Sequence, residues 1–117
     1  MTDTNIKNLP EGNYFTELGY SQSYPWVEVA RTAKTVTVAK VDVDRDPDWK
    51  PEMYPGGFAA HCTNQSEQTW LFKGINRERT RTLRLCKGRR AGAKQDWMHR
   101  GSIFVEGRAV EFYDYNF

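Results

Sequence analysis

The chain has 117 residues, a formal net charge of +2, and 38% hydrophobic and 27% charged residues. This length suits one domain, and an aromatic share of 14% supplies enough large apolar surface to exclude general disorder. No stretch approaches the length of a membrane span, and the N-terminus lacks the basic start and apolar core of a secretion signal. We therefore expect a soluble, unprocessed, cytoplasmic protein.

The first predicted elements are a flexible arm and a β-hairpin. Residues 1–12 are polar and aperiodic and include a proline and a glycine, which predicts an arm ahead of a single β domain over 13–117. Within that domain, "YPWVEVA" (24–30) favours extended chain, and "RTAK" has the character of a tight connection to "KTVTVAKVDVD" (34–44). These three stretches together predict a hairpin.

Four valines of the second hairpin strand occupy two registers, even-numbered first and odd-numbered afterwards: Val36, Val38, Val41 and Val43. Successive side chains of a strand point to opposite faces, so a regular strand could not bury all four together. An extra residue near Ala39 or Lys40 would restore a common face. The pattern therefore predicts a β-bulge at that point.

The segment "DRDPDWKPEMYPGG" (44–57) holds three prolines and two glycines, which predicts a long excursion without strands. We expect Trp49, Met53 and Tyr54 to hold it against the domain. Carboxylates recur at every second residue where this segment begins: Asp42, Asp44, Asp46 and Asp48. Calcium loops also use spaced acids, but the absence of a central glycine and the presence of Pro47 favour a solvated loop.

The second half of the chain predicts two further hairpins. "TWLFKGI" (69–75) and "RTLRLCKG" (81–88) both favour extended chain and suggest the first pair. "SIFVEGRAVEFYDY" (102–115) suggests the second pair, turning at Glu106-Gly107. Between these pairs, "AGAKQDWMHR" (91–100) supports at most one short helical turn.

These elements predict an all-β fold of about five to seven short strands. A chain of this size protects its sheet edges best by curving, so we expect a small SH3-like barrel or a strongly curved antiparallel sheet with long loops. Alternation with polar neighbours predicts a core that contains Val27, Val29, Val36, Val38, Leu83, Leu85, Ile103, Val105, Val110 and Phe112.

Three stretches of the chain resemble a family of small uncharacterised proteins encoded by bacteriophages and prophages. They are "GYSQSYPWVEVARTAKTVTV" (19–38), "TLRLCKG" (82–88) and "RGSIFVEGRAVEFYDYNF" (100–117), with Tyr-Pro, Lys-Thr-Val and C-terminal Tyr-Asp-x-x-Phe patterns. Tyr115 replaces a proline that is usual in the family, so the chain end is expected to be extended where relatives turn. The resemblance implies a cytoplasmic phage-type accessory protein with an SH3-like barrel and no established activity.

The soft metal ligands are two histidines and two cysteines: His61, Cys62, Cys86 and His99. Neighbours on an extended chain point to opposite faces, so His61 and Cys62 could share a zinc ion only across a sharp backbone turn. The favoured interpretation is that the cysteines are buried structural residues, since a buried free thiol behaves as a small hydrophobic group. We expect both thiols to be unbridged and no metal to bind.

Catalytic patterns are weak. A cysteine nucleophile would need His99 and an orienting group such as Asp96 beside it, and nothing in the sequence enforces that contact. "KGRRAGAK" (87–94) lacks the residue order of a phosphate-binding loop, and no serine or threonine follows Lys94. We therefore expect no enzymatic activity and no cofactor.

One strongly basic stretch remains, in which nine lysines and arginines face a single acid, Glu78. Alternating arginines in a strand would share a face, and such a row suits the repeating charge of a phosphate backbone. An exposed strand face is also commonly charged, and edge cations prevent aggregation, so a solvated surface is the competing interpretation. The stretch comprises Lys73, Arg77, Arg79, Arg81, Arg84, Lys87, Arg89, Arg90 and Lys94.

The leading functional hypothesis is non-catalytic binding of nucleic acid by this stretch, with Trp70 and Trp97 as candidate stacking platforms. The main alternative is a protein-binding inhibitor or modulator of a host or anti-phage defence enzyme. A virion component is a third hypothesis, and an enzyme is the last.

Overall fold

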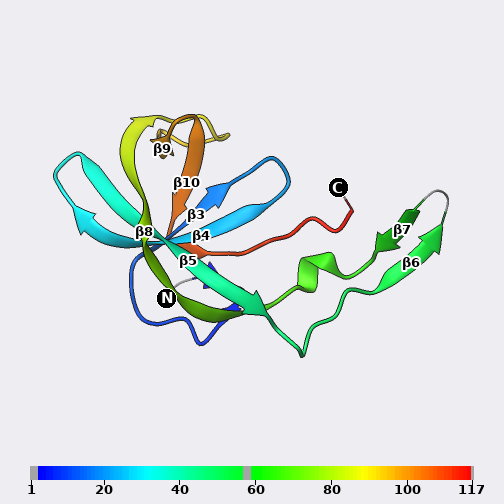
Figure 1. The fold of residues 1–117 in the computed structure, drawn as a ribbon. Helices are drawn as coiled ribbons and strands as arrows, with labels where there is room; N and C mark the ends of the chain where they lie inside the picture. Colours follow the sequence, from blue (N-terminus) through cyan, green and yellow to red (C-terminus); the bar gives the residue numbers. More distant parts are fainter. Residues whose placement is uncertain (1–2, 57–58, 117) are drawn as a thin grey trace.

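In a computed structural model, which describes residues 3–56 and 59–116, six antiparallel strands close into a barrel. The ring runs β8, β5, β4, β3, β10 and β9, and β9 pairs back with β8 (Figure 1). This closure confirms the predicted all-β barrel. The ring strands are β3 (Tyr14–Leu18), β4 (Ser23–Arg31), β5 (Thr35–Arg45), β8 (Trp70–Lys87), β9 (Gln95–His99) and β10 (Ser102–Glu106).

Each strand of the ring sends an apolar side chain into a common barrel core. Two rings of this core, Trp26 and Phe104, meet edge to face with centroids 5.8 Å apart, a favoured aromatic geometry. Trp97 of β9 packs against the cluster from its margin. The fully buried members are Phe15, Trp26, Val36, Val38, Leu83 and Phe104.

A second core lies on the other side of the sheet and buries the N-terminal segment. Two short strands, β1 (Asp3–Thr4) and β2 (Ile6–Lys7), pair in parallel with β11 (Arg108–Ala109) and β8. Strand structure therefore begins at Asp3 and not near Asn13, because Ile6 supplies the outer core with an apolar anchor. This core comprises Ile6, Tyr14, Val27, Ala39, Val41 and Ala109.

The two valine registers of β5 reflect these two cores. Val36 and Val38 belong to the barrel core, whereas Val41 belongs to the outer core and Val43 packs against it. The predicted irregularity does occur between Ala39 and Lys40. Its extra residues, 77–79, lie in the partner strand β8, so the expectation that all four valines share one face is wrong.

The β4–β5 hairpin is confirmed, with hydrogen bonds between Thr32 and Thr35 closing its turn. Two other local predictions fail because distant pairings override local pattern. The stretches 69–75 and 81–88 belong to one strand, β8, and not to a hairpin. Residues 91–100, which support at most one short helical turn by sequence, contain β9. The chain does turn at Gly107, with φ 87°, but β11 then pairs with β1 and not with β10.

The predicted core is partly correct. Val36, Val38 and Leu83 are buried in the barrel core, whereas Val27 is buried in the outer core, so the expectation of one common core is wrong. Four further members are half-buried: Ile103, Val105, Val110 and Phe112. Val29 and Leu85 are 37% and 44% exposed. Val29 is the unpaired residue at a bulge in β4, where the register shifts between Glu28 and Ala30, and Leu85 lies where β8 leaves β5 for β9.

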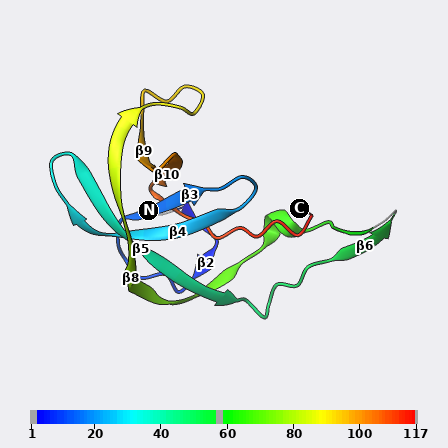
Figure 2. The same cartoon turned by 45° about the horizontal axis from the view of Figure 1, so that its top comes forward.

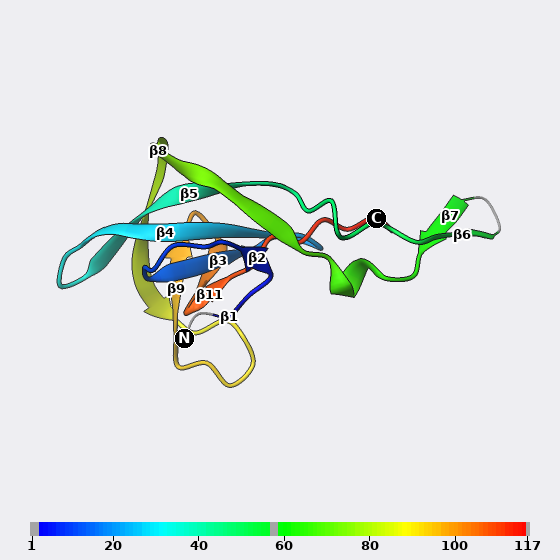
Figure 3. The ribbon, with the colours of Figure 1, turned by 90° about the horizontal axis from the view of Figure 1, so that it is seen from below.

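A separate hairpin projects from the barrel and gives the molecule extents of 51 × 30 × 26 Å (Figures 1 and 3). It pairs β6 (Met53–Gly56) with β7 (Ala59–Cys62), so the excursion does contain strands. A short 3-10 helix, η1 (Gln65–Glu67), leads back to β8. No helix in the described ranges is long and apolar enough to cross a membrane.

The last described residues of the chain attach the projecting β6–β7 hairpin and its connections to β5 and β8, together called the arm below, to the barrel. Tyr113 and Gln68 exchange two hydrogen bonds, and Asn116 bonds both backbone groups of Cys62. Trp49 packs against Tyr115 with ring centroids 5.6 Å apart. Met53 and Tyr54, in contrast, are exposed, so of the three residues expected to hold the excursion down only Trp49 does so.

Candidate functional site

The basic stretch occupies β8 and the loop that follows it. Figure 2 shows β8 bending as it runs from the base of the arm toward this loop. Arg81 is half-buried and the other eight cations are exposed. Six of the nine lie on β8, and Arg89, Arg90 and Lys94 lie in the loop between β8 and β9.

Few of these cations are neutralised within the fold. Lys73 lies 3.9 Å from a carboxylate oxygen of Asp44, and Arg90 lies 2.7 Å from one of Asp96. Within residues 3–56 and 59–116, the remaining seven form no salt bridge. The side chains without an ion-pair partner are Arg77, Arg79, Arg81, Arg84, Lys87, Arg89 and Lys94.

The arginines of β8 do not form the simple alternating row that the sequence predicts. Ala39 pairs with Thr80 and Lys40 with Asn76, so residues 77–79 bulge out of the ladder. The guanidinium groups of Arg79, the last residue of the bulge, and of Arg81, which follows it, lie 5.8 and 5.3 Å from the ring centre of buried Trp26. These cation–π contacts hold two of the cations over the barrel core.

An open groove of about 500 Å³ lies beside these arginines. It forms because β8 pairs with β9 only from Arg84 onward, leaving the preceding residues of β8 apart from the β9–β10 turn. Its lining is rich in hydrogen-bond donors: two guanidiniums, three hydroxyls and an imidazole. The lining residues are Glu17, Thr80, Arg81, Thr82, His99, Arg100 and Ser102.

Two internal contacts fix the polar groups of this basic groove. The single carboxylate, Glu17, accepts a hydrogen bond from the indole N–H of Trp26 at 3.1 Å. The Nδ1 of His99 lies 3.2 Å from the carbonyl oxygen of Thr82, which accepts a hydrogen bond from the ring in the tautomer that carries the proton on Nδ1. Both contacts tie the groove wall to the barrel strands.

Arg100 stands at the rim of the basic groove on a two-residue turn between β9 and β10. Its φ is 47° and that of Gly101 is 85°, so both central residues have the positive φ of a type I′ turn. Glycine adopts this conformation without cost, whereas an arginine there loses about 1–2 kcal/mol. The turn therefore holds a cation in a rigid, unfavourable position where Asn would fit better.

The loop over 88–94 is organised by buried Asp96. One carboxylate oxygen accepts the backbone N–H groups of Arg89 and Arg90 at 2.7 and 3.1 Å, and the other accepts Nε of Arg90. The backbone hydrogen bond from Arg89, together with the bonds from Arg90, lowers the pKa of Asp96. Arg90 is thus a structural residue, although the sequence predicts a solvent-facing contact.

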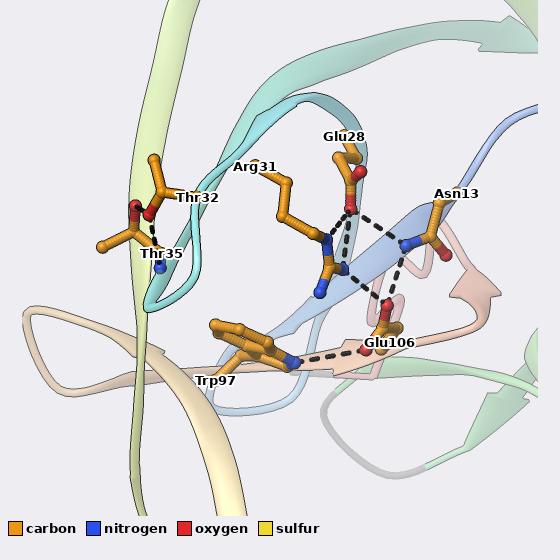
Figure 4. A network of polar contacts seen from close by, with 7 residues as sticks. All are labelled: Asn13, Glu28, Arg31, Thr32, Thr35, Trp97 and Glu106. Carbon is orange, nitrogen blue, oxygen red and sulfur yellow. Dashed lines mark hydrogen bonds and ion pairs between the residues drawn. The ribbon is translucent and has the colours of Figure 1, made fainter.

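The two candidate stacking platforms are already engaged. Trp97 donates its indole N–H to Glu106 at 3.2 Å, within a network in which Arg31 contacts both Glu28 and Glu106 (Figure 4). The guanidinium of Arg31 also covers the Trp97 ring at 5.5 Å. Trp70 packs against the outer core and donates to Gln68, and both tryptophans are half-buried.

Cys62 is buried and Cys86 is exposed, and both thiols are free. Cys62 and exposed His61 differ in burial, as expected for neighbours in a strand. Across the described ranges, no cluster of three or more His, Cys, Asp or Glu side chains could hold a metal ion.

Sequence reasoning locates the cations but misses the rest of the basic groove. The hydroxyls of Thr80, Thr82 and Ser102, together with His99 and Arg100, come together only through the pairing of β8, β9 and β10. Two sequence features could have pointed to this groove: threonines flank an arginine in "TRT" (80–82), and the dipeptide Arg-Gly (100–101) is suited to a turn. No family model, curated protein or solved structure matches this chain.

Proposed function

We propose that this chain binds nucleic acid without catalysis, through the basic groove and the cations that continue from it along β8 and the following loop. The observation that carries the proposal is the donor-rich groove beside seven cations without ion-pair partners in the described structure. Arg79 and Arg81 lie over Trp26. The other five, Arg77, Arg84, Lys87, Arg89 and Lys94, have neither an ion-pair nor a cation–π partner in the described structure and remain available to a ligand.

Phosphate oxygens accept hydrogen bonds and carry negative charge, so they match this donor set. Arg81 and Arg100 offer planar guanidinium groups, which recognise phosphate with two parallel hydrogen bonds. Threonine and serine hydroxyls are further phosphate contacts in protein–DNA interfaces. The groove thus suits the backbone of a nucleic acid and provides no helix for reading bases in a major groove.

Contact with the nucleic-acid backbone predicts two properties of the binding affinity. Affinity depends weakly on sequence, and it falls steeply with salt because each neutralised phosphate releases a counterion. For roughly four to six phosphates, log K decreases against log salt with a slope of about −3 to −5. Base stacking contributes little at Trp97, since one ring face and the N–H of that side chain are engaged.

Fluorescence anisotropy with labelled single- and double-stranded oligonucleotides, at several salt concentrations, tests the proposal. The decisive variant reverses three exposed cations without ion-pair partners in the described structure, Arg84→Glu, Lys87→Glu and Arg89→Glu. We expect a loss of affinity of at least about a hundredfold for every sequence, with an unchanged unfolding temperature. Binding that survives these reversals, or no binding at low salt, contradicts the proposal.

The projecting arm favours a second candidate, a protein-binding inhibitor or modulator of a host or anti-phage defence enzyme. Met53 and Tyr54 of β6 are 46% and 70% exposed, and tyrosine and methionine are enriched at protein interfaces. Capture of partners from a bacterial lysate with and without nuclease separates the two candidates. A nuclease-resistant partner lost in a Met53→Ser, Tyr54→Ser variant supports the modulator.

The proposed setting, the cytoplasm of a bacterial host, comes from the resemblance to phage-type accessory proteins. It agrees with the nucleic-acid proposal, because the genome and transcripts of the host occupy the same compartment.

A further inference from the structure

A second cavity lies at the base of the arm, away from the residues of the basic groove. It holds about 320 Å³, near the lower end of the range for small-molecule sites, and opens between the end of β5 and the start of β8. Three aromatic rings contribute to its wall, from Trp49, Trp70 and Tyr115. We call it the aromatic pocket.

The rings and their neighbours form a largely apolar surface. Tyr115 meets Trp49 in a tilted contact, and Pro47 and Pro51 complete the apolar lining. Planar, rigid walls of this kind favour a flat ligand, because stacking gains contact area without ordering flexible side chains.

The charge at the aromatic pocket is positive. Its carboxylate, Asp46, is committed to the fold, since it accepts bonds from Lys7 at 2.7 Å, from Thr69 at 2.6 Å and from the backbone N–H of Asp48. Arg45 and Lys50 are exposed and form no ion pair in the described ranges. A cationic ligand is therefore disfavoured and an anionic one favoured.

A polar group in the wall also lacks a partner. The Nε1 of Trp49 is buried, and nothing in the described structure accepts its hydrogen bond. Trp26, Trp70 and Trp97, in contrast, all donate to side-chain oxygens. A buried donor without an acceptor is unfavourable, and an acceptor on a bound ligand would relieve it once the indole tilts toward the pocket.

We propose that the aromatic pocket binds a nucleotide-like ligand, a planar heteroaromatic ring that carries a phosphate. The ring stacks on the aromatic wall, a ring nitrogen or carbonyl accepts the Trp49 N–H, and the phosphate meets Arg45 and Lys50. This proposal stands apart from the basic groove. The ligand can be a free mononucleotide or an unpaired nucleotide of a single strand.

NMR of the ¹⁵N-labelled chain titrated with AMP tests the site directly. The four tryptophans give four indole N–H signals, and Trp49→Phe identifies that of Trp49 by its loss. We expect AMP to shift the Trp49 signal most, and adenosine or ribose 5-phosphate to bind about tenfold more weakly because each lacks half of the recognised features.

Substitutions at exposed residues test the site without disturbing the fold. Lys50→Gln and Arg45→Gln should each weaken AMP binding about three- to tenfold, while the charge reversals at Arg84, Lys87 and Arg89 leave it unchanged. A shift with a single-stranded oligonucleotide alone assigns the ligand to a strand. An unmoved Trp49 signal with both AMP and oligonucleotide, or a shift produced only by a proline-rich peptide, overturns the proposal.

Discussion

The acidic run over 42–48 and the basic stretch over 73–94 are comparable clusters in the sequence, but the fold uses them differently. Asp44 pairs with Lys73, and Asp46 is buried against Lys7, Thr69 and a backbone N–H. Seven cations of the basic stretch have no such partner within the described residues. Charge density alone therefore does not identify a binding surface, and the proposed surface rests on the contrast between paired and unpaired charges.

The variant with the largest expected effect removes Asp46, the carboxylate of the acidic run with the most contacts. Asp46→Ala leaves the Lys7 ammonium, the Thr69 hydroxyl and the Asp48 N–H without their common acceptor. We expect Tm to fall by at least about 5 °C, measured by circular dichroism. Asp48→Ala is the matched control, since Asp48 is exposed and its contact with Lys7 is 3.5 Å. An equal fall in Tm for both variants would contradict the distinction between the buried, paired Asp46 and the exposed Asp48.

Acid titration sharpens the same point. The hydrogen bond from Lys7, followed by that from Thr69, lowers the pKa of Asp46 from 3.8 to about 2. A lowered folded-state pKa stabilises the fold above the unfolded value, and this contribution is lost as pH falls from about 4 toward 2. Chemical denaturation across that interval should show a steeper loss of stability for wild type than for Asp46→Asn.

Arg100 tests the opposite case, a cation that the fold tolerates at a cost. Asparagine adopts positive φ more readily, so Arg100→Asn should raise the free energy of unfolding by up to about 1 kcal/mol. The same change should weaken oligonucleotide binding about three- to tenfold, because a guanidinium is lost from the basic groove. Arg108→Gln, which neutralises an exposed arginine that does not line the groove, should leave binding near wild type.

Lys73 should give the smallest effect. It is the cation of β8 that already has an acidic neighbour, and both side chains are exposed, 64% for Lys73 and 60% for Asp44. Exposed pairs contribute little, so Lys73→Gln should change stability by less than about 0.5 kcal/mol. Oligonucleotide affinity should fall less than for Arg100→Asn, as measured by anisotropy. A larger loss of oligonucleotide affinity would indicate that the proposed nucleic-acid interface reaches the base of the arm.

Local sequence pattern predicts this fold where the pairing is local. The β4–β5 hairpin follows from two extended stretches and a polar connection. The change of valine register, in contrast, does not mark an extra residue in β5, because the extra residues opposite Ala39/Lys40 lie in β8. A change of valine register has two possible causes, a bulge within the strand or burial of both faces of the strand, and the sequence does not distinguish them. Val36 and Val41 serve different cores, and only the packing of Ile6 from the N-terminal segment reveals this.

The candidate sites divide in the same way. The cations are visible in sequence because charge is a property of single residues, but the groove that gathers Thr82, Arg100 and Ser102 depends on where β8 separates from β9. Arg90 could not be recognised as structural, since its partner Asp96 acts through a loop conformation. Long-range contacts thus decide which polar residues are available to a ligand.

Closure of the barrel between β3 and β10 constrains how the chain folds during synthesis. Phe15 pairs with Glu106 and Leu18 with Ile103, so the first ring strand must wait for the last ring strand to leave the ribosome. Until then β3 has an unpaired edge, with apolar Phe15 prone to association with other chains. Non-local pairing of this kind also makes folding slow. Chaperone capture of nascent chains stalled before β10, and release once β10 has emerged, is the expected behaviour.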